Sequence, residues 1–238
     1  MRRRSLIAAA GLTAAFPNRA RANDPVDVAL VLAVDVSRSI DEDEARLQRE
    51  GYRNAVSDPV VVEAIRGGML GAIAIAYVEW AGIEYQRTVL PWQRIANAQD
   101  AQTWAQRLAE APRVSLSWTS ISGGIRQARR ELAACPFEAT RRVIDVSGDG
   151  VNNSGPPAED ERDGAVGEGI TINGLPIIND RPTFGRRPSI PLDQYFQDSV
   201  IGGTGAFMIV AEDFESFGVA VKRKLIREIA ALEGPLRG

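Results

Sequence analysis

The sequence predicts a doubly wound α/β domain, with a mostly parallel six-stranded sheet flanked by helices. The segment VALVLAV at residues 28–34 is an almost continuous apolar run, which is typical of a strand buried on both faces of a parallel sheet. Strand-like and helix-like patterns then alternate along the chain, without an internal repeat or a linker between domains. The length of 238 residues is ample for one such domain.

Six segments have the pattern of strands, and the third of them alternates in a way that suits an antiparallel edge strand. They are residues 27–34, 70–79, 84–90, 142–147, 169–174 and 206–211. Seven segments have the pattern of helices, and Asp41 and Glu44 have the spacing of a capping box at the start of the first. The helices are expected at 41–57, 60–66, 98–110, 121–134, 158–168, 191–200 and 214–232.

The first 22 residues have the features of an export signal. Three arginines at 2–4 precede a short apolar run at 6–16, and residues 20–22 (ARA) resemble a cleavage site. The run is too short for a transmembrane helix, which needs about 20 apolar residues. A general signal and a twin-arginine signal both fit. We therefore expect residues 23–238 to form a single exported domain, periplasmic or secreted, with no transmembrane segment in the mature chain.

The composition excludes several classes of function. The chain has no histidine, which excludes Ser-His-Asp and Cys-His catalysis and histidine-bound zinc or haem. The net charge is −3 and no basic block follows the first 22 residues, so nucleic acid is not an expected partner. The single Cys135 cannot form an internal disulfide. Lys222 and Lys224 are the only lysines, and both lie in the last predicted helix.

Asp35, Ser37 and Ser39 form a D-x-S-x-S run between the first predicted strand and the helix that follows it. In open parallel sheets, ligands bind beyond the carboxyl ends of the strands. A carboxylate and two hydroxyls at such a place suit a magnesium-like cation, although the same residue types are also common helix caps. Thr119 precedes a predicted helix and Asp149 follows a predicted strand, so both are expected at the same edge of the sheet.

With these three motifs in this order, the chain resembles the von Willebrand factor type A (VWA) domain and its metal-ion-dependent adhesion site (MIDAS). Within that family it looks like an uncharacterised group of exported bacterial proteins. The resemblance implies that Ser37 and Ser39 bind the metal directly and that Thr119 binds directly or through water. It also implies that Asp35 and Asp149 hold the ion mainly through its waters. The expected ion is Mg²⁺ or Mn²⁺, and an acidic residue of a protein or peptide partner completes its coordination.

Further residues near these motifs are candidates for contact with that partner. Arg38 lies inside the D-x-S-x-S run, where its charge would either repel the ion or grip an acidic ligand. Asn152 and Asn153 follow Asp149 and are expected to shape the turn, with contacts to the ligands of the metal as the alternative. Asn152 is also a candidate for contact with the partner. The long segment 175–190 is rich in Pro, Arg and Gly and is either a solvated loop or a specificity element. Its candidate residues are Arg181, Arg186 and Arg187.

Two acidic residues interrupt predicted strands. Asp145 lies in the buried strand at 142–147, where a charge needs a partner. A structural pair with an arginine such as Arg142 is expected, with a functional role as the alternative. Glu79 ends the second strand and is expected to bond nearby backbone, while Trp80 beside it is expected to serve packing.

The leading hypothesis for function is a non-catalytic binding module that engages a partner carboxylate through a divalent cation. One alternative is a metal-dependent hydrolase such as a phosphatase, since hydrated magnesium near carboxylates can also catalyse hydrolysis. The absence of histidine and the position of both lysines disfavour it, because such sites usually use a lysine clamp and a general base. Another alternative is a structural domain with a vestigial metal site, which the charge of Arg38 leaves open.

Overall fold

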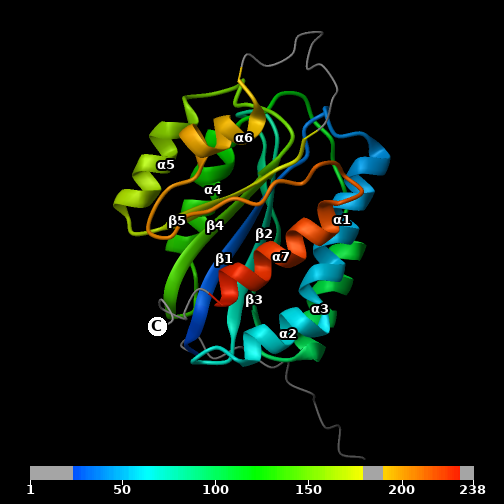
Figure 1. Ribbon diagram of the computed structural model, residues 1–238, viewed down its shortest axis with the longest axis vertical. Coiled ribbons are helices and arrows are strands. Elements are labelled where there is room, and N and C mark those ends of the chain that lie inside the picture. Colours follow the sequence, from blue (N-terminus) through cyan, green and yellow to red (C-terminus); the bar gives the residue numbers. More distant parts are fainter. Residues whose placement is uncertain (1–23, 179–189, 231–238) are drawn as a thin grey trace, which may run out of the picture.

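The computed structural model describes residues 24–178 and 190–230 (Figure 1). The predicted export signal at 1–22 lies outside the described residues, as do Arg181, Arg186 and Arg187. Within the described ranges, no helix is both long enough and apolar enough to cross a membrane.

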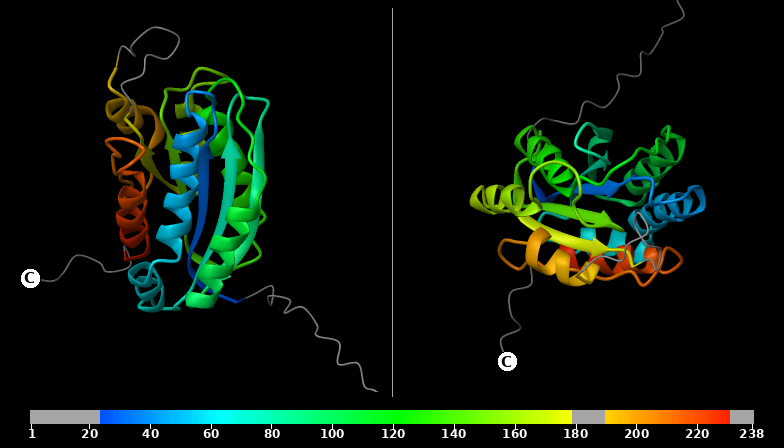
Figure 2. Two further views of the ribbon diagram at one scale, coloured as in Figure 1. Left: turned by 90° about the vertical axis from the view of Figure 1, so that its right-hand side faces the viewer. Right: turned by 90° about the horizontal axis from the view of Figure 1, so that it is seen from above.

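The central strand of the sheet is β1 (Val26–Asp35), which is buried along its whole length. Its side chains alternate between two cores. Val28, Leu30 and Leu32 pack on one face of the sheet, whereas Ala29 and Val31 pack on the other. Figure 2 shows the sheet between layers of helices on both sides. This arrangement confirms the doubly wound α/β class and explains the almost continuous apolar run.

Within the described residues the sheet has five strands, in the order β3-β2-β1-β4-β5. β1 pairs in parallel with β2 (Ile73–Trp80) and with β4 (Ala139–Gly148), and β4 pairs in parallel with β5 (Thr171–Pro176). β3 (Gln86–Ile95) runs antiparallel to β2 at one edge of the sheet. The predicted antiparallel edge strand is therefore confirmed, although it extends further along the chain than its alternating pattern indicated.

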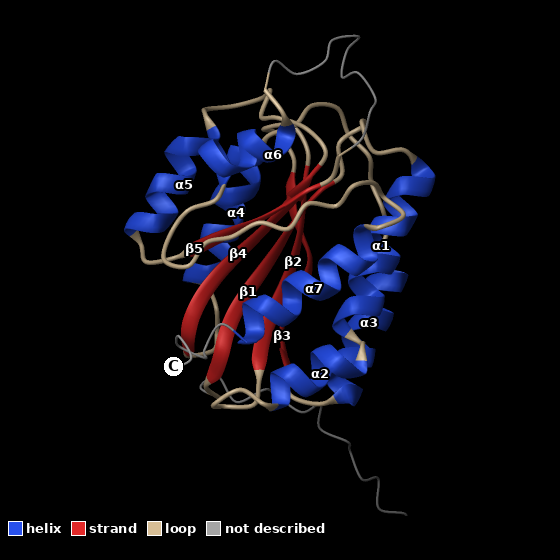
Figure 3. Cartoon of the chain, viewed as in Figure 1, coloured by secondary structure: helices blue, strands red, loops and turns tan. Residues whose placement is uncertain are grey.

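The predicted sixth strand at 206–211 does not form a regular strand, so the described sheet has five strands instead of six. The segment runs beside β5 but makes isolated bridges at Met208 and Ala211 (Figure 3). The N–H of Phe207 donates to the side-chain oxygen of Asn173 (3.1 Å), not to a backbone carbonyl. The segment still hydrogen-bonds to β5, because the N–H groups of Ile209 and Ala211 donate to the carbonyls of Gly174 (3.1 Å) and Pro176 (2.9 Å). Pro176 has no N–H to donate to the carbonyl of Ile209, so the ladder is interrupted there, and the side-chain bond of Asn173 ends it at Phe207.

Helices cover both faces of the sheet. Those on one face are α1 (Glu42–Val56), α2 (Pro59–Arg66), α3 (Ala98–Glu110) and α7 (Phe217–Ala230). Those on the other face are α4 (Ile121–Ala133), α5 (Ala158–Gly167) and α6 (Leu192–Tyr195), which continues as a π-helical turn at Phe196–Val200. The predicted capping box of α1 is present, because Asp41 accepts from the N–H of Glu44 and the Glu44 side chain accepts from the N–H of Asp41.

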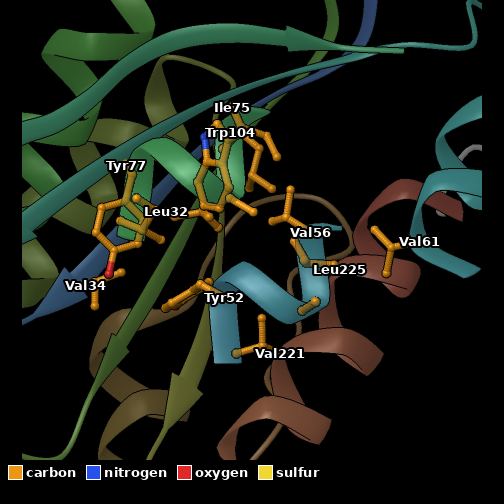
Figure 4. Close-up of a cluster of buried hydrophobic side chains, with 14 of the residues drawn as sticks. Leu32, Val34, Tyr52, Val56, Val61, Ile75, Tyr77, Trp104, Val221 and Leu225 are labelled. Carbon is orange, nitrogen blue, oxygen red and sulfur yellow. The ribbon is translucent and has the colours of Figure 1, made fainter. Parts of the chain in front are cut away.

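The core under α1, α3 and α7 is built around aromatic side chains (Figure 4). Tyr52 lies edge-to-face against Tyr77 and Phe217, with ring centroids 5.5 and 5.4 Å apart. Trp104 continues the cluster, 6.1 Å from Tyr77. Such edge-to-face pairs each contribute roughly 0.5–1.5 kcal/mol beyond the area they bury. They fix α1, which begins three residues after the D-x-S-x-S run, firmly on the sheet.

A buried ionic cluster joins α7 to the sheet, and it corrects the predicted partner of Asp145. The Nζ of Lys224 lies 2.7 Å from Asp145 and 2.5 Å from Glu228, and all three side chains are buried. Asn173 on β5 donates to Glu228 (2.9 Å). Arg142 cannot take this role because strand residues three apart point to opposite faces. Its guanidinium instead donates to the carbonyl of Glu168.

We expect the stability of the domain to fall as the pH rises from about 4 to about 7, because of Asp145. Burial raises the pKa of this carboxyl from 3.8 to about 7, against the opposing effect of Lys224 and with the repulsion of Glu228. In this range the folded chain keeps a proton that the unfolded chain has lost, so unfolding becomes easier as the pH rises. The loss is on the order of 3 kcal/mol.

Urea denaturation of the wild type and of Asp145→Asn between pH 4 and 8 measures this effect. In the variant the contribution of this group is absent, so its free energy of unfolding depends less on pH. Parallel pH profiles for the two proteins would show that another group is responsible.

Candidate metal site

The first part of the site is the turn that follows β1. Asp35 ends the strand and is buried, and its Oδ1 accepts from the N–H of Ser37 (2.7 Å). The turn closes with a bond from the N–H of Ile40 to the carbonyl of Ser37 (3.1 Å). Gln48 of α1 donates to the carbonyl of Asp35 (3.2 Å). The local bonding of an Asp to the backbone two residues on is what the D-x-S pattern favours, and it orients the carboxylate.

The second part is the loop after β4, which carries Asp149. Ser39 Oγ donates to Asp149 Oδ1 (2.7 Å), and the hydroxyls of Ser37 and Ser39 are 2.9 Å apart. Gly148 lets this loop approach β1 closely, since a Cβ there would lie 3.1 Å from Asp35 Oδ2. Hydrogen bonds between these side chains therefore link the loop after β1 to the loop after β4, although the two loops are far apart in the sequence.

The third part is the loop before α4, which carries Thr119. Ser120 caps the helix by accepting from the N–H of Gly123 (3.1 Å), and its own N–H donates to the carbonyl of Ala81 (2.7 Å). The buried side chain of Thr119 faces the Asp149 loop, because a Cβ on Gly150 would lie 3.8 Å from Thr119 Oγ1. The three predicted segments thus meet at the carboxyl ends of β1 and β4, at the upper end of the sheet in Figure 1.

Two asparagines tie the Thr119 and Asp149 loops together. Asn153 Oδ1 accepts from the N–H of Thr119 (2.8 Å), while the N–H of Asn153 donates to the carbonyl of Thr119 (2.9 Å). Asn152 Oδ1 accepts from the N–H of Ser122 (3.2 Å), and its amide group donates to the carbonyl of Pro156 (2.9 Å). The sequence indicated that these residues shape a turn, but it did not reveal the second loop that they hold.

The electrostatics of the site favour a cation. Burial raises the pKa of Asp35 well above 3.8, and the negative charge of Asp149 raises it further, while bonds from Ser37 lower it. In the part of the chain that the structure describes, Asp35 Oδ2 is buried without a hydrogen-bond partner. An orphaned carboxylate oxygen beside a second carboxylate is costly unless positive charge is supplied. The residues present therefore fit a bound cation.

The donor set also indicates which kind of cation fits. Among the described residues, no group of three or more Asp, Glu, His or Cys side chains comes together. A cation at Asp35 and Asp149 would therefore be completed by the neighbouring serine and threonine hydroxyls and by water. Neutral hydroxyls leave positive charge on the ion, which keeps its attraction for an anionic ligand.

The surroundings of the site contain an arginine and an apolar hollow. Arg38 is exposed in the turn between the two serines. Beside the Thr119 loop, Ile83, Tyr85, Leu116 and Trp118 line a hollow in the surface. Trp118 has a φ of 73° and is 55% exposed. Such a backbone conformation is uncommon for a bulky residue, and strained conformations of this kind cluster at functional sites.

Glu79 and Trp80 contribute to structure near this edge. Glu79 is buried and pairs with the Arg49 guanidinium (2.6 Å), where the sequence predicted a backbone partner. Arg49 also donates to the carbonyl of Ala111 (2.6 Å), so the pair joins α1, β2 and the end of α3. Trp80 is fully buried, as predicted, and packs against Gly124 of α4.

Comparisons with known structures identify the fold. The mussel byssus proximal thread matrix protein 1, in a form described with a zinc-occupied MIDAS motif, matches with a TM-score of 0.58 at 16% identity, over 86% of this chain and 47% of that one. A von Willebrand factor type A protein from Catenulispora acidiphila matches with a TM-score of 0.56 at 16% identity, over 86% and 43%. The chain spans less than half the length of these two proteins.

A third structure corresponds to the domain alone. The vWF domain of the type V pili tip protein Mfa5 from Porphyromonas gingivalis matches with a TM-score of 0.58 at 10% identity, over 90% of this chain and 99% of that one. No curated protein sequence matches the chain. A family model described as a protein of unknown function (DUF1194) matches residues 25–233. The chain therefore belongs to the DUF1194 family, and its fold is that of the VWA domains.

Proposed function

We propose that this domain is a non-catalytic binding module that engages an acidic residue of a protein or peptide partner through a divalent cation, Mg²⁺ or Mn²⁺. The observation that carries the proposal is the convergence of two buried carboxylates and three hydroxyls at one edge of the sheet, with one carboxylate oxygen left without a hydrogen bond among the described residues. Hard oxygen ligands of this kind suit these two ions.

The residues have distinct roles in this proposal. Ser37, Ser39 and Thr119 would hold the ion through neutral hydroxyls, while Asp35 and Asp149 would hold it mainly through water. A bound cation supplies positive charge that attracts a carboxylate of the partner. The surrounding loops exclude part of the solvent, which strengthens that attraction. The exposed Arg38 is placed to contact the same acidic partner.

The known structures support the proposal at a coarse level. The mussel protein is described with zinc in its MIDAS motif, and the pilus adhesin SpaC of Lactobacillus rhamnosus GG is another structure of similar fold, with a TM-score of 0.58 at 17% identity. Neither lysine lies at the site: Lys222 pairs with Asp58 on α2, and Lys224 is in the buried cluster. A lysine clamp for phosphoryl transfer is therefore missing, which supports binding over catalysis.

Calorimetric titration of residues 23–238 with MgCl₂ and MnCl₂ tests the metal site. We expect saturable binding of one ion per chain. No binding at millimolar metal would contradict the proposal and favour a vestigial site. Metal-dependent turnover of p-nitrophenyl phosphate that Asp35→Asn abolishes would favour a hydrolase instead.

The partner is tested with the immobilised domain and an extract of exported proteins. We expect the domain to retain a protein in the presence of Mg²⁺ and to release it when a chelator is added. Replacement of one acidic residue of that protein by its amide (Asp by Asn, or Glu by Gln) should abolish retention. Equal retention with and without metal would show that binding of the partner does not depend on the cation, which would contradict the proposal.

A further inference from the structure

We propose that Asn153 is a positioning residue of the metal site, which sets the affinity for the cation without touching it. The inference deepens the proposed function and rests on it. Its basis is that one side chain holds the backbone of Thr119, a residue from a different loop whose hydroxyl belongs to the candidate donor set.

The geometry around Thr119 is that of a clamp. The side-chain oxygen of Asn153 accepts a hydrogen bond from the N–H of Thr119 (2.8 Å). The backbone N–H of Asn153 donates a hydrogen bond to the carbonyl of Thr119 (2.9 Å). Both backbone polar groups of Thr119 are therefore bonded to a single residue. The N–H of Ser154 also donates to the Thr119 carbonyl (3.1 Å), so this carbonyl accepts two hydrogen bonds from the Asp149 loop.

The rest of the Thr119 loop shows why the clamp is needed. The loop is tied down at Leu116, whose N–H donates to the carbonyl of Val36 (3.3 Å), and at Ser120, whose N–H donates to Ala81 (2.7 Å). Between these points Trp118 adopts a φ of 73°, a conformation that costs a non-glycine residue energy. Without the Asn153 oxygen, the Thr119 N–H loses its partner and the strain at Trp118 is free to relax. The Thr119 hydroxyl then moves from its place.

The clamp also joins two ligand loops. Asn153 lies four residues after Asp149, so it fixes the Thr119 loop to the loop of a second candidate ligand. The distance between the two donor groups is then set before any ion arrives. Hydrogen-bond partners of metal ligands typically change metal affinity 10- to 100-fold when they are removed.

Calorimetry with MgCl₂ alone, on the wild type and three variants of residues 23–238, tests the inference. We expect Asn153→Ala to weaken Mg²⁺ binding about tenfold or more with one ion still bound per chain. Asn153→Asp keeps the Oδ1 acceptor and is expected to stay within about threefold of the wild type in 0.5 M KCl, where the added charge is screened. The matched control Asn54→Ala, on an exposed position of α1, is expected to leave binding unchanged.

The outcomes separate this inference from the proposed function. If the wild type binds no Mg²⁺, the proposed function fails. If the wild type binds and Asn153→Ala binds equally well, Asn153 has no positioning role and the proposed function stands. Should Asn153→Ala fail to fold in a metal-free thermal melt, Asn153→Gln keeps the amide but displaces its oxygen by one methylene. The same weakening is expected for it, and wild-type affinity in that variant would overturn the inference.

Discussion

Asp149→Ala is expected to weaken Mg²⁺ binding by at least about 100-fold while the metal-free domain remains as stable as the wild type or becomes more stable. Asp149 supplies one of the two negative charges at the site, and its removal leaves only Asp35 to neutralise a divalent ion. In the metal-free chain, however, the charge of Asp149 repels that of Asp35, which is one cause of the raised pKa of Asp35. Removal of Asp149 relieves this repulsion, which offsets the loss of the hydrogen bond from the half-buried Ser39 (2.7 Å).

Two measurements check this pair of opposite effects. Calorimetry gives the affinity for Mg²⁺, and thermal melts with and without 10 mM MgCl₂ (roughly saturating for the expected millimolar or tighter binding) give the stability gained from the ion. Asp160→Ala removes an exposed carboxylate from the first turn of α5 and serves as the matched control, which should keep the full metal response. A destabilised metal-free Asp149→Ala protein, or one that keeps its metal response, would contradict the expectation.

The positions of the five candidate ligands could be predicted because local patterns determine them. Asp35 follows an apolar run that has to be a central strand, and Asp149 follows another. In a parallel sheet the carboxyl ends of such strands share one edge. Thr119 precedes a helix that packs back on this sheet, which brings its loop to the same edge. The periodicity of the sequence was therefore enough to predict that these residues come together.

The features that could not be predicted depend on contacts between distant segments. The partner of Asp145 is Lys224 on the last helix, and nothing near Asp145 in the sequence indicates which helix covers that face of β4. The clamp of Asn153 on Thr119 depends on how two irregular loops meet. The segment 206–211 has the composition of a strand and hydrogen-bonds to β5, but Pro176 on that strand has no N–H to continue the ladder and the Asn173 side chain accepts from the N–H of Phe207. Such choices are made by tertiary packing.

Lys224→Met is expected to lower the free energy of unfolding at pH 7 by roughly 3–5 kcal/mol. The ammonium group lies between Asp145 and Glu228, and all three side chains are buried. Without it, two carboxyls face each other in an apolar core with no cation, and at least one must take up a proton or draw water inside. Urea denaturation at pH 7 measures the loss, with Lys222→Met as the matched control.

Lys222 lies two residues away on the same helix and pairs with Asp58 (2.7 Å), but its side chain is 36% exposed. Its loss should cost no more than about 1 kcal/mol, as for other pairs near the surface. Addition of Asp145→Asn and Glu228→Gln to Lys224→Met removes both uncompensated charges while it keeps an acceptor for Asn173, so most of the lost stability should return. Equal costs for the two lysines would show that the buried cluster contributes no more than a surface ion pair. No recovery in the triple variant would show that uncompensated charge is not the cause of the loss. Recovery would show that the complete ionic cluster and its neutral replacement give similar free energies of unfolding. The loss in Lys224→Met would then come from the charges left without a partner.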